Sequence, residues 1–169
     1  APGKAVKEAY DSSGVVANDR GITVWLKGNR VSRNQIMAIK EESVTDQKNS
    51  LTVCLDNILR HAGITRNTEY DLAQGKTAIQ ILEENMTGVQ VLDLSGCSLD
   101  AVLYYVNQDI PVLAILEDGE AVLVTGFNEF NVVIMEPSTG KLYKKGMNDA
   151  TAWFAENGNH FITYMRTEN

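Results

Sequence analysis

The sequence predicts an α+β fold in which helices come first along the chain and an antiparallel sheet follows. Two observations support this prediction. Before residue 108, several segments carry apolar residues at three- and four-residue spacing, the pattern of amphipathic helices. After residue 110, short runs rich in β-branched residues alternate with brief turns, and such short connections join antiparallel neighbours.

The clearest helix is predicted from Ser50 to His61. Its apolar side chains recur every three or four residues and therefore share one face: Leu51, Cys54, Leu55, Ile58 and Leu59. Gly63 follows as the residue that most easily adopts the left-handed conformation of a helix end. Weaker helical patterns predict four further helices, over residues 32–42, 77–86, 99–107 and 147–155.

Strands are predicted where β-branched and aromatic residues gather between turn signals. These segments are residues 22–26, 89–94, 111–116, 120–127, 131–135, 141–145 and 161–165. The length of the chain, 169 residues, suits one domain. We expect residues 1–46 to form an N-terminal extension and residues 47–169 to form the core.

Composition excludes several functional classes. The formal net charge is −7, and the Lys and Arg residues are scattered, so nucleic acid is not an expected partner. Apolar runs are far shorter than the roughly 20 residues that cross a bilayer, so no membrane-spanning segment is expected. The 2 Cys and 2 His residues lack metal-site spacing, and neither a metal nor a cofactor is predicted.

Three short motifs follow one another along the predicted core. The first begins at Gln47, reaches Ser50 at the start of the predicted helix and ends at Gly63. The second comprises Asp-Ile-Pro-Val over residues 109–112 and Glu-Ala-Val-Leu-Val-Thr-Gly-Phe-Asn over residues 120–128. The third is Glu-Pro-Ser-Thr-Gly over residues 136–140. This order resembles the papain-like cysteine peptidases, and most closely the double-glycine leader peptidases that process bacteriocins.

The resemblance implies a papain-like fold, with N-terminal helices packed on a C-terminal antiparallel sheet. It places Ser50 at the position of the family's nucleophilic Cys, and Glu120 at the position of its general-base His. It places Glu136 where the family has the Asp that orients the imidazole, and Gln47 where a donor to the oxyanion would stand. A carboxylate with a pKa near 4 is too weak a base to activate a hydroxyl. The resemblance therefore implies a domain that has kept the fold and lost the catalysis.

On this basis we expect a non-catalytic domain of a bacterial exported or surface protein, which binds an extended peptide or packs against neighbouring domains. An extracellular or cell-surface location is expected for such a domain. The opening Ala-Pro-Gly-Lys without an initiator Met suits either a processed secreted protein or a piece of a longer chain. The same positions also have plain structural explanations. Ser50 is suited to cap a helix, Gln47 to precede it, and Glu120 and Glu136 to occupy turns.

An alternative makes the chain an active thiol enzyme. Cys54 would then be the nucleophile and His160 its base. His61 is excluded as the base, because it lies seven residues after Cys54 on one helix, about 10 Å along the axis. In a secreted protein, a disulfide between Cys54 and Cys97 is a further possibility.

Overall fold

The computed structural model of the chain describes residues 35–36 and 49–167. Within these residues, one antiparallel sheet has the strand order β2-β7-β3-β4-β5-β6, and β1 pairs with β4 off this path. The strands are β1 (Gln35–Ile36), β2 (Val89–Asp93), β3 (Val112–Ile115), β4 (Ala121–Phe127), β5 (Asn131–Glu136), β6 (Lys141–Gly146) and β7 (His160–Arg166). β2 and β6 therefore end the described strand order.

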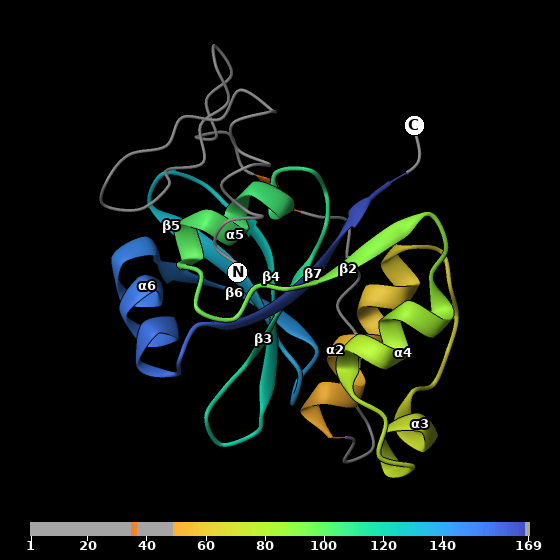
Figure 1. Cartoon of the computed structure of the whole chain (residues 1–169). Helices are drawn as coiled ribbons and strands as arrows, with labels where there is room; N and C mark the ends of the chain where they lie inside the picture. The colour runs from red at the N-terminus through yellow and green to blue at the C-terminus, as the bar shows by residue number, and fades with distance from the viewer. Residues whose placement is uncertain (1–34, 37–48, 168–169) are drawn as a thin grey trace.

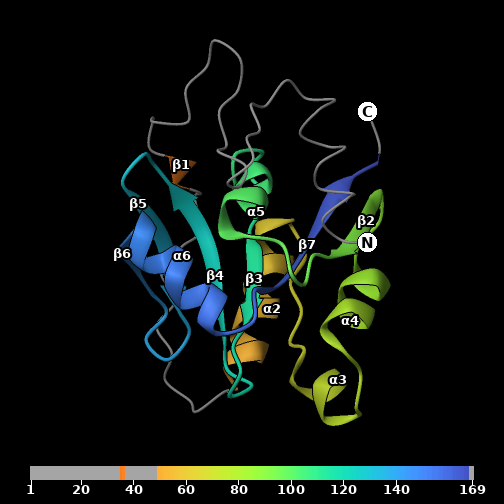
Figure 2. The same ribbon diagram turned by 60° about the vertical axis from the view of Figure 1, so that its left-hand side comes forward.

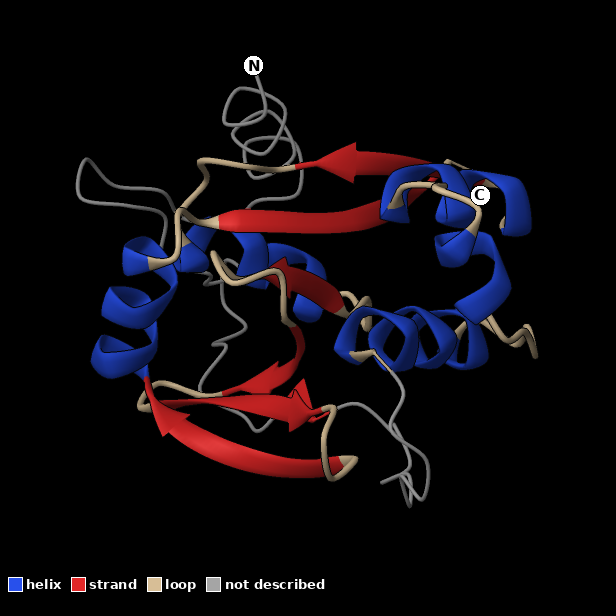
Figure 3. Cartoon of the chain, turned by 90° about the horizontal axis from the view of Figure 1, so that it is seen from below, coloured by secondary structure: helices blue, strands red, loops and turns tan. Residues whose placement is uncertain are grey.

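Helices cover both faces of this sheet. They are α2 (Ser50–His61), α3 (Glu69–Ala73), α4 (Ala78–Asn85), α5 (Leu99–Val106) and α6 (Met147–Glu156). Figure 1 shows α2, α3 and α4 gathered on one side of the strands and α5 and α6 on the other. In this arrangement α2 packs on β3 and β4, α4 on β2, α5 on β3, β4 and β7, and α6 on β5 and β6. The turned views in Figures 2 and 3 show the strands between these two groups of helices.

Local sequence explains where the helices begin and end. The Asn49 side chain caps α2 by accepting a hydrogen bond from the Leu51 amide at 2.7 Å. Gly63 follows α2 with a φ of 88°, in the left-handed region that glycine enters without strain. Thr77 and Gln80 form a reciprocal capping box at the start of α4, and Ser98 caps α5.

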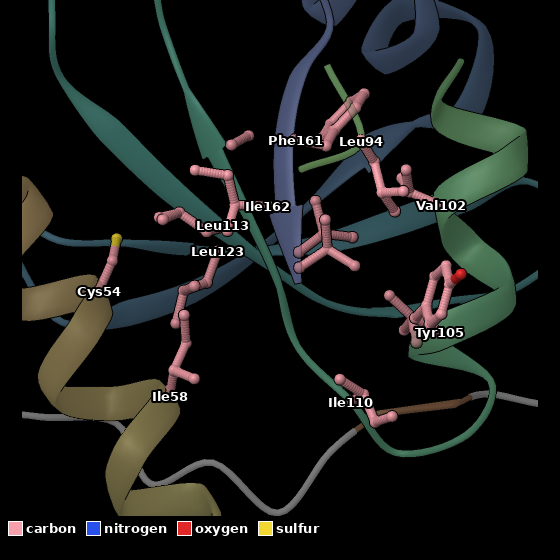
Figure 4. Packing of buried hydrophobic residues seen from close by; sticks show 14 of the residues in the cluster. Cys54, Ile58, Leu94, Val102, Tyr105, Ile110, Leu113, Leu123, Phe161 and Ile162 are labelled. Carbon is pink, nitrogen blue, oxygen red and sulfur yellow. The ribbon is translucent and has the colours of Figure 1, made fainter. Parts of the chain in front are cut away.

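The central strands are buried because helices pack on both faces. Every residue of β4 is buried, which accounts for its almost continuous apolar sequence. Figure 4 shows Cys54 and Ile58 projecting from α2 on one side of the strands, with Val102 and Tyr105 projecting from α5 on the other. Leu113 of β3 pairs with Leu123 of β4 and with Ile162 of β7, so one apolar row crosses three strands.

The predicted α+β class is confirmed, with one difference. As the predicted elements indicated, β2 comes before α5 and α6 comes before β7. The helix predicted over residues 32–42 is wrong at Gln35–Ile36, which form β1. β3 pairs with β4 no further than Val124, so the last residues of β4 have an open edge that β1 fills. Pairing across the fold has outweighed the local helical spacing there.

Some predictions fall on residues that the structure does not describe. The predicted strand at residues 22–26 lies outside these residues, and so does most of the predicted extension over residues 1–46. The division into an extension and a core stays a prediction. The short helix α3 was not predicted. Among the residues that the structure describes, no helix has the length and apolar character needed to cross a membrane.

Candidate functional site

Ser50 is the first residue of α2, and its side chain joins this helix to the sheet. Its Oγ accepts a hydrogen bond of 2.9 Å from the backbone N–H of Ala121, at the start of β4. The pairing of β4 with β5 reaches only Leu123 opposite Met135, so Ala121 lies beyond the last pair on that side. The Ser50 hydroxyl thus satisfies an amide for which β5 offers no partner.

This contact corrects the structural explanation for Ser50. The sequence suggested a cap for the helix, but Asn49 is the cap and Ser50 is already helical. The amide that Ser50 accepts belongs to β4, 71 residues further along the chain. No local pattern could have indicated Ala121 as its partner. Asn49 belongs to a residue type that commonly caps helices, but it was not singled out from the sequence.

Glu120 directly precedes Ala121, so the Ser50 contact lies on the peptide that links these two residues. The Glu120 side chain is exposed. Its backbone is held in the tip of the β3–β4 hairpin, where its N–H donates to Asp118 Oδ1 at 2.9 Å and its carbonyl accepts from Leu116 at 2.8 Å. Ser50 and Glu120, two positions singled out by the resemblance, are therefore neighbours in space.

Glu136 ends β5 at the same end of the sheet. Because β4 and β5 are antiparallel, the end of β5 lies beside the start of β4. The Glu136 carboxylate is engaged in its own turn, where Oε1 accepts from the N–H and the Oγ of Ser138 at 3.1 and 3.0 Å. Glu136 is also close enough to Cys54 to contribute to the rise in the pKa of that thiol. Gln47 lies outside the described residues.

Neither histidine of the chain stands at the Ser50 contact. His61 ends α2, and its Nε2 lies 3.2 Å from the carbonyl oxygen and 3.3 Å from Oδ1 of Asp109. His160 begins β7 opposite Ile115, which in turn pairs with Ala121. The usual spacing of strands puts about 10 Å between the backbones of His160 and Ala121. Among the described residues, no hydrogen bond joins the Ser50 hydroxyl to either imidazole.

Cys54 lies one turn after Ser50 on α2 and is 0% exposed. Burial is the main cause that raises its pKa well above the ordinary value, and the Glu136 carboxylate adds to the rise. Such a thiol stays protonated and closed to substrates, the opposite of what a nucleophile needs. No hydrogen bond joins Cys54 to His160 in the part of the chain that the structure describes. Cys54 and Cys97 are both buried free thiols, and the possible disulfide is not formed.

The charged side chains that the structure describes do not form a metal centre. Across residues 35–36 and 49–167, no group of three or more His, Cys, Asp or Glu side chains is arranged to hold a metal ion. The polar groups around Ser50 are a hydroxyl, backbone amides and carboxylates. This set can bind the backbone of a peptide through hydrogen bonds, but it contains no base suited to activating a hydroxyl.

The fold is similar to that of a protein proposed to be a C39-like peptidase. A crystal structure of a proposed C39-like peptidase from Bacillus anthracis matches this chain with a TM-score of 0.64 and 14% sequence identity. The match covers 79% of this chain and 98% of that one. No protein-family model matches the sequence, and no curated protein matches it. At this identity the similarity establishes the fold and leaves the activity to be argued from the residues.

Proposed function

We propose that this chain is a C39-like peptidase domain that no longer hydrolyses peptides and instead binds an extended peptide segment. The expected setting is a bacterial exported or surface protein, in which the segment belongs to a partner or to a neighbouring domain. The location remains a prediction, because two free thiols give no sign of an oxidising compartment.

The observation that carries this proposal is the state of the Ser50 hydroxyl. A peptidase nucleophile hydrogen-bonds to a base that removes its proton during attack. Here the hydroxyl oxygen accepts from the Ala121 amide, and the residue before that amide is Glu120. The chain contains 2 histidines, and both lie on other parts of the fold. The Ser50 hydroxyl and the Ala121 amide are suited to holding the fold together and to binding, and not to proton transfer.

The fold supports an extended peptide as the ligand. A peptidase-like scaffold presents its cleft to an extended chain, and main-chain hydrogen bonds can hold such a chain without any reaction. The exposed β3–β4 hairpin and the turn after β5 lie at the same end of the sheet as Ser50, where a peptide would pass. Loss of the imidazole removes the chemical step and leaves these surfaces in place.

The proposal is tested by adding an unstructured synthetic peptide that contains a Gly-Gly pair to the isotope-labelled chain. We expect the amide NMR signals of Ser50, Ala121 and the β3–β4 hairpin to shift in a saturable way. We expect mass spectrometry to find the peptide uncleaved. A Ser138→Ala variant, altered in the neighbouring turn, serves as a control for shifts caused by small local changes. Cleavage of the peptide would contradict the loss of catalysis, and unchanged signals at Ser50 and Ala121 would contradict peptide binding.

A further inference from the structure

A pocket of about 660 Å³ opens at the far end of α2 from Ser50. Three segments line it: the end of α2 with the following turn, the connection from α4 into β2, and the end of β7. These elements lie beside one another in Figures 1 and 2. Because α2 has 12 residues, its two ends are about 18 Å apart. The pocket is therefore separate from the Ser50 contact.

Tyr164 supplies a hydrogen-bond donor that the protein does not use. The residue lines the pocket and is only 2% exposed. Its hydroxyl has no hydrogen-bond partner among the described residues. It is not sealed from solvent, unlike Asn159 Oδ1, which is both buried and unpaired. The hydroxyl therefore faces the open space of the pocket. Burial raises its pKa, so it stays protonated and able to donate.

Arg166 places a positive charge beside this hydroxyl. Its Nη1 donates to the carbonyl oxygen of Gln108 at 3.1 Å, which orients the guanidinium. In the described part of the chain it forms no ion pair, so its other N–H groups are available to a ligand. His61 also lines the pocket, and its Nε2 lies 3.3 Å from Oδ1 of Asp109, the carboxylate that adds to the rise in the pKa of Tyr164.

The rest of the lining combines apolar side chains with the Thr87 side chain and the Gly88 backbone. Ile64, Met86 and Val89 supply apolar surface in the same pocket, so one part of a ligand would be held by charge and another by apolar contact. A single guanidinium with one neutral donor matches a singly charged planar anion better than a phosphate. We propose that this pocket binds a carboxylate that carries a short apolar group. The C-terminal residue of a peptide and a free N-acylated amino acid share this chemistry.

The pocket is tested by calorimetric titration of the full chain with N-acetyl-L-leucine and with its C-terminal amide. We expect saturable binding of the acid with a Kd of about 1–10 mM, typical of so small a ligand. We expect the amide to bind at least about tenfold more weakly, because it loses the charge-assisted pair. Titration with a peptide that ends in leucine distinguishes the two sources of such a carboxylate. Tighter binding than N-acetyl-leucine indicates a peptide C-terminus, and equal binding indicates a small carboxylate.

Variants connect the binding to the named side chains. We expect Tyr164→Phe to weaken binding about fivefold and Arg166→Gln at least about tenfold, the usual effects of losing a neutral and a charged hydrogen bond. Tyr143→Phe and Lys144→Gln on β6 are the matched controls and should leave Kd unchanged. Equal affinity for acid and amide, or an unchanged Kd in Tyr164→Phe, would overturn the proposal. So would the lack of saturation at about 50 mM. If Arg166→Gln does not fold, Tyr164→Phe and the acid–amide pair decide the question.

Discussion

Replacing Ser50 with alanine removes the acceptor that holds the start of β4. Ala121 is 1% exposed, so water cannot readily take the place of the Ser50 hydroxyl. Leaving a buried amide without a partner costs about 1–3 kcal/mol. Alanine favours the helix over serine by up to about 0.5 kcal/mol, which offsets part of this cost. We therefore expect Ser50→Ala to lower the free energy of unfolding by about 1–2 kcal/mol.

Urea unfolding followed by circular dichroism measures this change, with hydrogen exchange of the Ala121 amide as a local readout. The exchange of that amide should become faster in Ser50→Ala, because its proton has lost its acceptor. Ser138→Ala is the control, since its hydroxyl donates to Glu136 on the exposed turn and should contribute less than about 0.5 kcal/mol. If Ser50→Ala is as stable as Ser138→Ala and the Ala121 amide exchanges at its original rate, the hydroxyl does not join α2 to β4.

Two further predictions concern buried titratable groups. Cys54 and Cys97 are buried free thiols with raised pKa values. Iodoacetamide should therefore modify neither thiol in the native protein and both in urea. Rapid labelling of Cys54 in the native protein would support the alternative of a thiol enzyme. Burial raises the pKa of Tyr105 to about 12, from an ordinary value of 10.0, so its neutral form is favoured by folding. Its contribution to stability is complete below pH 10 and is lost as the pH rises toward 12. Tyr105→Phe should therefore lose less stability than the parent chain between about pH 9 and about pH 11 in urea titrations, and equal losses would contradict this assignment.

Local patterns were enough to predict most elements of the fold. The helix predicted from Ser50 to His61 has these bounds in the structure, because its apolar spacing and Gly63 agree on where it lies, although its cap is Asn49 rather than Ser50. The strands from residue 111 onward lie within one or two residues of their predicted ends. The helix α3 escaped prediction because it spans five residues and buries only Asp71, so it has no apolar stripe to detect.

The candidate site was only partly accessible from sequence. Ser50 and Glu120 were selected by resemblance, and they are neighbours in the structure because the start of α2 packs against the start of β4. The actual partner of the hydroxyl, the Ala121 amide, carries no side-chain signal at all. The Tyr164 pocket was missed for a similar reason. It forms where three segments distant in sequence meet, and neither Tyr164 nor Arg166 belongs to a recognisable motif.

The last strand of the described order bears on how the protein behaves at high concentration. β6 carries Lys141 and Lys144 on exposed positions, and Lys145 lies 5.0 Å from the centre of the Trp153 ring. A second sheet could add to such a strand only by bringing these ammonium groups together and stripping their water, which is unfavourable. The charges of these lysines thus oppose aggregation through the β6 edge. Removing their charges would expose a strand of ordinary backbone donors and acceptors to the same strand of another molecule.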